Sequence, residues 1–176
     1  MFSVSIDNVA SLEISSARGD YWYVIHGDGT SGQTVVEQQS GYRYFYVGKD
    51  VPFIVNSQGY CEDIEQFRNL YLFLLELEYE GAVADDPAFS HQSKDDIMAD
   101  DSQCLLSFVL TMEDGREITY RFFPYSERHS MVCVSGEGME DVAVFYTLTA
   151  SVRRIANATW QLANGVYIDP DFRYQD

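Results

Sequence analysis

Basic residues are scarce in this chain, and their scarcity excludes the commonest polyanionic partners. Eleven lysines and arginines stand against 28 aspartates and glutamates in 176 residues, which gives a formal net charge of −17. Nucleic acids and anionic membrane surfaces would be repelled, so we expect no nucleic acid partner and no direct insertion into a membrane. Cationic ligands, metal ions and basic protein partners stay open, although an acidic surface also simply keeps a protein soluble.

Cysteine is rare as well, and its spacing excludes two kinds of framework. Cys61, Cys104 and Cys133 are odd in number and far apart. The chain therefore has no disulfide scaffold and no CxxC zinc knuckle. One disulfide with a free thiol stays open, but three buried thiols are the simpler interpretation.

Long hydrophobic runs are missing, and no basic N-terminal region precedes a shorter one. We therefore expect no signal peptide and no transmembrane span. Two locations stay open on this evidence. One is the cytoplasm, and the other is the cell envelope, if the sequence is a module of an anchored protein.

Catalytic motifs are missing around the three histidines, His26, His91 and His129. No G-x-S-x-G nucleophile elbow occurs, and neither Cys61 nor Cys133 stands with a histidine in a recognisable motif. We therefore expect that the protein is not an enzyme, and we assign no catalytic residue and no cofactor.

Three acidic pairs, Asp85-Asp86, Asp95-Asp96 and Asp100-Asp101, lie in one polar stretch of the chain. Paired carboxylates suit calcium, but the EF-hand spacing, with glycine sixth and glutamate twelfth, is absent. We therefore expect no metal site. Residues 81–103 are interpreted as an acidic linker or loop with a short helical turn near Ile97.

Aromatic residues, in contrast, are abundant. Thirteen tyrosines and 11 phenylalanines contribute to an aromatic content of 15%, and the total hydrophobic content is 46%. Such a composition excludes a disordered chain, favours strands, and is sufficient for a sizeable core.

The second half of the chain contains a hairpin signal whose register can be derived. If Glu113-Asp114-Gly115 is a three-residue loop closed by glycine in the left-handed region, Phe108 faces Tyr120. Apolar side chains then gather on one face. A two-residue loop at Asp114-Gly115 would place Phe108 opposite Arg121, so the hydrophobic pattern selects the three-residue loop.

A similar signal occurs near the N-terminus. With Ala17-Arg18-Gly19 as a three-residue loop, Ile14 faces Trp22 and Leu12 faces Val24. Two hairpins of the same kind in one chain indicate an internal repeat.

Each hairpin is followed by a polar connection, two further strands and a helix. The expected strands lie at residues 42–47, 51–55, 130–134 and 142–146, and the expected helices at 62–80 and 150–163. These elements predict an α+β protein, rich in antiparallel strands, with two similar β-β-β-β-α halves and their helices packed on the sheet. The boundaries are residues 1–80, the linker 81–103 and residues 104–176, and we expect the three parts to form one compact unit in space.

The two expected helices differ in their patterns. The helix over 62–80 is apolar on nearly all sides, so it should be the more buried one. The second helix should begin with Thr149 as its N-cap and end before Gly165. Arg153 and Arg154 fall outside its apolar stripe, and the tail that follows is expected to fray or to add a strand.

The order of residues 110–117, 120–128 and 145–149 resembles repeat modules of uncharacterised bacterial envelope proteins, of the gliding-motility and ABC-transporter accessory type. The resemblance implies an extracytoplasmic module tethered elsewhere in its parent chain, with a protein or another envelope component as partner. It brings no functional residue with it. We therefore expect a non-enzymatic binding or structural module. The alternative is a small-ligand-binding protein or hydrolase with a site between the two halves, near His26 and His129.

Two strands combine arginine with aromatic residues, and we predict from them an exposed aromatic binding face. Its residues would be Tyr42, Tyr44, Tyr46, Arg121, Phe123 and Tyr125. Tyrosine and arginine are favoured at binding hot spots. Ordinary sheet packing, with an arginine laid over aromatic rings, is the competing interpretation.

Overall fold

The structure is a computed structural model, and it describes residues 4, 8–27, 34–40, 43–47, 53–55, 60–62, 64–83, 94–137 and 143–172. The strands are β1 Val9–Ser16, β2 Gly19–Gly27, β3 Thr34–Ser40, β4 Arg43–Val47, β5 Phe53–Val55, β6 Tyr60–Glu62, β7 Gly81–Ala82, β8 Leu106–Met112, β9 Glu117–Pro124, β10 His129–Gly136 and β11 Ala143–Leu148. The helices are α1 Ile64–Leu75, α2 Lys94–Met98 and α3 Thr149–Ala163, with a 3-10 turn, η4, at Asp101–Gln103.

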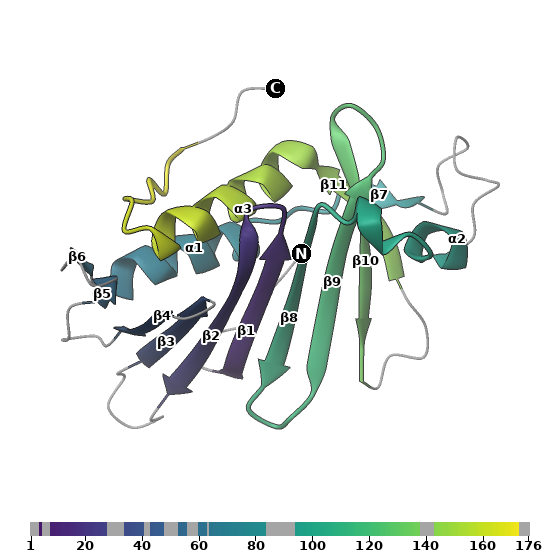
Figure 1. The fold of residues 1–176 in the computed structure, drawn as a ribbon. Coiled ribbons are helices and arrows are strands. Elements are labelled where there is room, and N and C mark those ends of the chain that lie inside the picture. Colours follow the sequence, from purple (N-terminus) through teal and green to yellow (C-terminus); the bar gives the residue numbers. More distant parts are fainter. Residues whose placement is uncertain are drawn as a thin grey trace.

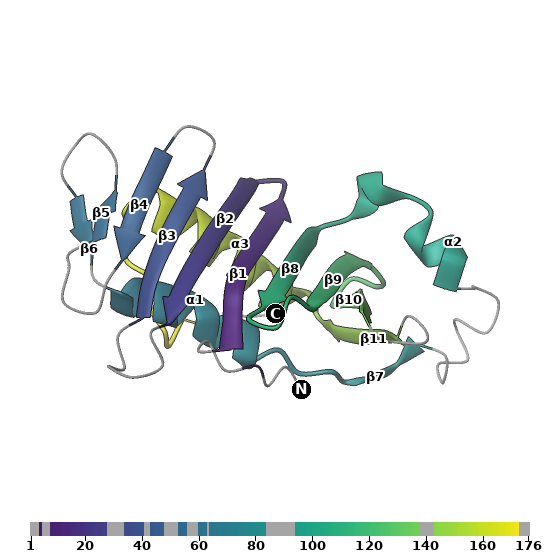
Figure 2. The ribbon, with the colours of Figure 1, turned by 90° about the horizontal axis from the view of Figure 1, so that it is seen from below.

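Nine of these strands form one antiparallel sheet in the order β4-β3-β2-β1-β8-β9-β10-β11-β7, and β5 pairs with β6 separately. Both long helices, α1 and α3, lie on the same face of the sheet (Figures 1 and 2). The predicted α+β class with antiparallel strands and packed helices is therefore confirmed.

The main hydrophobic core lies between the helix pair and the sheet. Phe67 and Leu74 of α1 and Ile155 of α3 pack in one cluster with Phe108 and Phe122, and all five are fully buried. Burying one such side chain contributes roughly 1.5–3 kcal/mol, so this layer fixes the positions of both helices.

A smaller core lies on the opposite face of the sheet, beside α2. Successive side chains of a strand point to opposite faces, so Phe122 faces the long helices and Phe123 faces away from them. Ile97 of α2 packs there with Met131 and Cys133. The sheet is thus covered on both faces around β9 and β10.

The predicted register of the second hairpin is confirmed. Phe108 pairs with Tyr120, and the amide of Met112 donates to the carbonyl of Arg116 at 2.8 Å. The amide of Gly115 closes the turn on the Met112 carbonyl at 2.9 Å. Gly115 has a φ of 86°, in the left-handed region that favours glycine.

The predicted register of the first hairpin is wrong by one residue. Ile14 pairs with Tyr21 and Leu12 pairs with Tyr23, so the loop is the two-residue Ala17-Arg18. Both tyrosines are buried in the main core. Because residues 21–24 are all apolar, the hydrophobic pattern does not distinguish the two registers, and a one-residue slip exchanges the faces.

The strand order of the first half also departs from the prediction. The polar stretch expected to be a connection contains β3, which pairs with both β2 and β4. β5 was expected to return along β4, and it pairs instead with β6. In the second half, the four predicted strands are all present, as β8, β9, β10 and β11.

Both helices differ from their expected limits or surroundings. α1 ends at Leu75 and is followed by a turn at Glu76, and residues 77–80 have no regular secondary structure, although Leu77 is still fully buried. Thr149 is the first residue of α3 and Leu148 is the N-cap, so the predicted N-cap is wrong by one residue. The Thr149 amide donates to the Arg128 carbonyl at 2.8 Å. Arg154 is buried, although the pattern placed it outside the apolar stripe of the helix.

The end of α3 and the connection between the halves are only partly as expected. Gly165, with a φ of 66°, ends α3, and the Val166 amide donates to the Gln161 carbonyl at 2.8 Å, as in a Schellman motif. The linker contains the expected helical turn, α2, but it begins with β7, which lengthens the sheet beside β11. Among the described residues, no helix has the length and hydropathy to cross a bilayer.

Candidate functional site

The structure does not bring the predicted aromatic residues together into one face. Tyr44 and Tyr46 lie on β4, where they pair with residues of β3, and Tyr42 lies outside the described residues. Phe123 and Tyr125 lie on or just after β9, and four strands separate β9 from β4.

The predicted residues on or just after β9 are packed against neighbouring side chains and are not freely exposed. They are Arg121, Phe123 and Tyr125. Phe123 is 2% exposed, and the Arg121 guanidinium lies 5.0 Å from its ring centroid. Tyr125 is half-buried and stacks on Tyr146, with 5.4 Å between ring centroids. Arg121 also pairs with Asp101. Around Phe123, the ordinary packing interpretation with an arginine over the ring is therefore correct.

Phe123 and Tyr125 nevertheless border a cavity of about 310 Å³, which we call the α2 cavity. Its lining is Asp96, Ile97, Asp100, Gln103, Phe123, Pro124, Tyr125 and Met131. The Asp100 carboxylate accepts hydrogen bonds from the Ser102 hydroxyl at 2.5 Å and from the Gln103 amide at 2.7 Å. These bonds lower the pKa of Asp100, and they occupy the polar groups at this rim.

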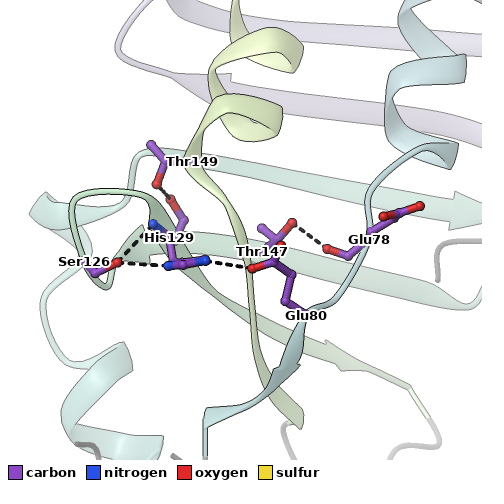
Figure 3. A network of polar contacts seen from close by, with 7 residues as sticks. Glu78, Glu80, Ser126, His129, Thr147 and Thr149 are labelled. Carbon is purple, nitrogen blue, oxygen red and sulfur yellow. Dashed lines mark hydrogen bonds and ion pairs between the residues drawn. The ribbon is translucent and has the colours of Figure 1, made fainter. Parts of the chain in front are cut away.

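His129 lies in a polar network at the start of β10 (Figure 3), on the same face of the sheet as Met131 and Cys133. Its Nε2 is 2.7 Å from an Oε atom of Glu80, and its Nδ1 is 3.1 Å from the Ser126 hydroxyl. Beside it, the Ser130 and Thr149 hydroxyls are 2.9 Å apart. The network joins the start of β10 to the chain segment that enters β7.

When the His129 ring is neutral and carries its proton on Nε2, its two hydrogen bonds run in one direction, from Ser126 through His129 to Glu80. The ring then donates to Glu80, and Nδ1 accepts the proton of the Ser126 hydroxyl. The Ser126 oxygen also accepts the backbone amide of His129 at 3.1 Å. The other candidate histidine, His26, lies on β2, and three strands separate β2 from β10, so the two histidines do not form one site.

A second cavity, of about 240 Å³, lies where α1, α3, the β1–β2 turn and the C-terminal segment meet. We call it the interhelix cavity. Its lining is Arg18, Phe73, Arg154, Asn157, Trp160, Gln161, Asp169 and Phe172. Aromatic rings, two guanidinium groups, two amides and one carboxylate therefore face a single space, which is the usual composition of a small-molecule site.

Arg154 is the fixed wall of the interhelix cavity. Its Nη1 donates to Glu76 at 2.6 Å and its Nη2 donates to the Pro170 carbonyl at 2.6 Å. The guanidinium also lies 3.5 Å from the centroid of the Phe73 ring. These contacts explain why an arginine that the helical pattern places outside is only 7% exposed.

The opposite wall of the cavity is more exposed. Trp160 is 38% exposed, and the Arg18 guanidinium lies 5.8 Å from its ring centroid. Arg18 belongs to the exposed β1–β2 turn. Within the part of the chain that the structure describes, no carboxylate forms an ion pair with Arg18.

The C-terminal segment closes the cavity and is held on α1 by two hydrogen bonds. The buried Ile168 donates its amide to Gln66 at 2.7 Å and accepts from the Asn69 side chain at 3.1 Å. Asp169 and Phe172, which follow, are both exposed and line the cavity. As far as Phe172, where the described residues end, the tail is therefore neither frayed at Ile168 nor an added strand.

The thiols and the acidic pairs offer little chemistry. Cys104 and Cys133 are free, and burial raises the pKa of Cys133 to about 11 and also raises that of Cys104. Cys61 lies on β6. Among the described residues, no three His, Cys, Asp or Glu side chains are grouped as metal ligands. Asp85-Asp86 and His91 lie outside the described residues.

The interhelix cavity was not predicted from the sequence, although the chain carries a signal for it. Residues 142–168 contain no aspartate or glutamate in a chain that has 28 of them, and they include two arginines and Trp160. A long acid-free segment in so acidic a protein indicates a surface whose charge is kept different from the rest.

The chain matches no protein-family model, no curated protein and no solved structure. The resemblance to bacterial envelope repeat modules therefore stays a prediction, and the function has to be argued from the residues of the chain itself.

Proposed function

We propose that this protein is a non-enzymatic binding module whose small-molecule ligand occupies the interhelix cavity. The observation that carries the proposal is the meeting of Arg18, Trp160 and Asp169 around one space of about 240 Å³. Ligand sites combine apolar and aromatic walls with a few polar groups that fix orientation, and this cavity has that composition. It lies between the helices of the two predicted halves, α1 and α3.

The test is binding measured by protein NMR against metal ions, nucleotides, sugars, amino acids and peptidoglycan fragments. The proposal expects at least one compound to shift signals of Trp160 and Asn157. An Asn157→Phe variant fills the cavity and should abolish those shifts. Arg153→Phe changes an exposed residue of the same helix and serves as the control. Shifts that persist in the Asn157→Phe variant, or that appear only elsewhere, contradict the proposal.

We also infer that the chain consists of two similar halves. In support, the series β1 to β4 and β8 to β11 run outward in opposite directions from the central β1–β8 pair. Each series is followed by a helix, although β5 and β6 intervene before α1. Superposing residues 9–75 on 106–163 in an experimental structure is the test. Unrelated helix directions after the four strands would contradict the inference.

The proposed location is the bacterial cell envelope, and it rests on the resemblance of the second half to envelope repeat modules. Fractionation of cells that carry the gene at its natural level tests it. Recovery of the protein with the envelope agrees with the proposal, and recovery only in the cytoplasmic fraction contradicts it.

A second candidate function is hydrolysis of an ester at the His129 network. The observation that favours it is the chain of contacts from Ser126 through His129 to Glu80. Ser126 Oγ would bond to the carbonyl carbon, its proton would pass to His129 and then to the departing alcohol, and water would release the acid. Labelling of Ser126 by a fluorophosphonate, lost in Ser126→Ala and kept in Ser107→Ala, supports hydrolysis. An unlabelled protein excludes it.

A further inference from the structure

Resting on the proposed binding function, we propose that the ligand of the interhelix cavity is a zwitterion of the α-amino-acid type with an aromatic or other apolar side chain. Its carboxylate would meet Arg18, its ammonium group would meet Asp169, and its side chain would lie against Trp160 and Phe172.

The first observation is that the cavity presents two opposite charges that are held apart. Arg18 and Asp169 both line it, and both are exposed. Neither forms an ion pair with any described residue, so their charged groups are more than 4.0 Å from each other. The Asp169 carboxylate accepts a hydrogen bond from the Asp171 amide at 2.9 Å. A ligand that carries both charges can satisfy both groups without leaving either charge uncompensated.

The second observation is that the remaining charges of the cavity are already matched. Arg154 is paired with Glu76 at 2.6 Å and with the Pro170 carbonyl at 2.6 Å. The charges of Arg154 and Glu76 therefore cancel. Arg18 and Asp169 cancel in the same way, so the cavity is formally neutral in a chain of net charge −17. A simple anion or a simple cation would leave one of the two exposed groups unmatched.

The third observation concerns the apolar part of the ligand. Trp160 and Phe172 are 38% and 49% exposed, and both border the cavity. Exposed aromatic rings beside polar groups are the features that anchor ligands at binding sites. An apolar side chain on the ligand would cover these rings and remove their surface from water.

The size of the cavity limits the ligand. A space of about 240 Å³ lies below the usual range of roughly 300–1,000 Å³ for drug-sized compounds. One amino acid, or the last residue of a short peptide, is therefore the expected size. A free amino acid and a short peptide both offer a carboxylate and an ammonium group. In the amino acid both groups belong to one residue, and in the peptide they belong to different residues.

The test is isothermal calorimetry with tryptophan, tryptophan amide, N-acetyltryptophan and the dipeptide alanyl-tryptophan. The amide lacks the carboxylate and the acetyl compound lacks the ammonium group. We expect free tryptophan to bind about tenfold or more tightly than either derivative, because each loses a charge-assisted contact. Tighter binding of the dipeptide would identify a peptide end as the source.

Two variants test which residue of the cavity contacts which charged group of the ligand. Arg18→Gln should remove the preference for tryptophan over its amide and keep the preference over N-acetyltryptophan. Asp169→Asn should do the reverse. Arg153→Gln and Glu127→Gln change exposed charges outside the cavity and should alter neither preference. Since all four positions are exposed, each variant is expected to keep the wild-type melting temperature.

The outcomes separate the two claims. If all four compounds bind with equal affinity and Asn157→Phe abolishes binding, the cavity is a ligand site and the zwitterion proposal is wrong. If none of the four binds and another compound shifts the Trp160 signals, the zwitterion proposal is again wrong and the binding function stands. If no compound reaches the cavity, both are wrong.

Discussion

On the helix side of the sheet, a cavity of about 240 Å³ presents Arg18, Asp169 and Trp160 to solvent, whereas the α2 cavity of about 310 Å³ on the other side presents Asp100 and Tyr125. Both contain acids, aromatic rings and an amide. They differ in how far those groups are already used by the protein.

At the α2 cavity, most polar groups are bound internally. Asp100 accepts from Ser102 and Gln103, and Tyr125 is stacked on Tyr146. At the interhelix cavity, Arg154 is bound internally in the same way, but Arg18 and Asp169 form no ion pair with described residues. The comparison shows that the same residue types have different roles in the two cavities. Where their polar groups are already bound within the protein they stabilise packing, and where those groups have no ion pair among the described residues they form a candidate ligand site.

The largest expected effect separates Arg154, which lines the interhelix cavity, from Arg121, which lies over the Phe123 ring beside the α2 cavity. Replacing Arg154 by methionine leaves Glu76 without its buried partner and should lower the free energy of unfolding by about 3 kcal/mol. Replacing Arg121, whose partner Asp101 is exposed, should cost less than about 1 kcal/mol. Urea unfolding of both variants measures the difference. Equal losses would show that Arg154 is not a structural wall of its cavity.

Cys133 gives a pH-dependent test of the α2 side. Burial raises the pKa of Cys133 from 9.0 to about 11, so the folded state keeps the neutral thiol that the unfolded chain loses first. This contribution is complete below pH 9 and is lost as the pH rises toward 11, on the order of 2 kcal/mol. Cys133→Ala should flatten that part of the stability profile. An unchanged alkaline slope would mean that Cys133 is accessible in the folded state.

Truncation of the C-terminal segment tests which of the two cavities binds tryptophan. Ending the chain after Asp169 removes the Pro170 carbonyl from Arg154 and removes the Phe172 wall. The affinity for tryptophan should fall several-fold, a change of about 1 kcal/mol. Tyr125→Ala, at the α2 cavity, should leave it unchanged, and calorimetry compares the two. A loss in Tyr125→Ala alone would move the site to the other face.

The smallest effect concerns Asp100, at the rim of the α2 cavity. Hydrogen bonds from the Ser102 and Gln103 side chains lower its pKa below 3.8. Because these bonds favour the ionised form, they stabilise the fold above that pH and are lost as the pH falls through the lowered pKa. NMR titration should find Asp100 ionised at lower pH than in Ser102→Ala. Identical titrations would show that the bonds are absent in solution.

Some of this structure follows from the sequence and some does not, for reasons that particular residues make clear. The second hairpin was predictable because Phe108 and Tyr120 alternate with polar neighbours, so that only one register separates the faces. The first hairpin was not, because Tyr21, Trp22 and Tyr23 are all apolar. β3 was missed because its Glu37, Gln38 and Gln39 resemble a polar connection.

The candidate site was less predictable than the fold. Arg154 is buried by Glu76, 78 residues away, and by Pro170, which follows the helix, and neither contact leaves a local pattern. The described residues of the predicted aromatic face lie on or beside two separated strands, and pattern alone does not reveal that four strands lie between β4 and β9. Position in the sheet, which is set by long-range pairing, decides which side chains meet.

The central claim is that the interhelix cavity binds an amino-acid zwitterion with an apolar side chain, and the most direct measurement is a crystal structure of the full chain grown with tryptophan. The account predicts one tryptophan between Arg18 and Asp169, with its ring against Trp160 and its carboxylate toward Arg18. An interhelix cavity that stays empty in a crystal grown with a large excess of tryptophan would contradict the account, whether tryptophan is bound elsewhere or not at all.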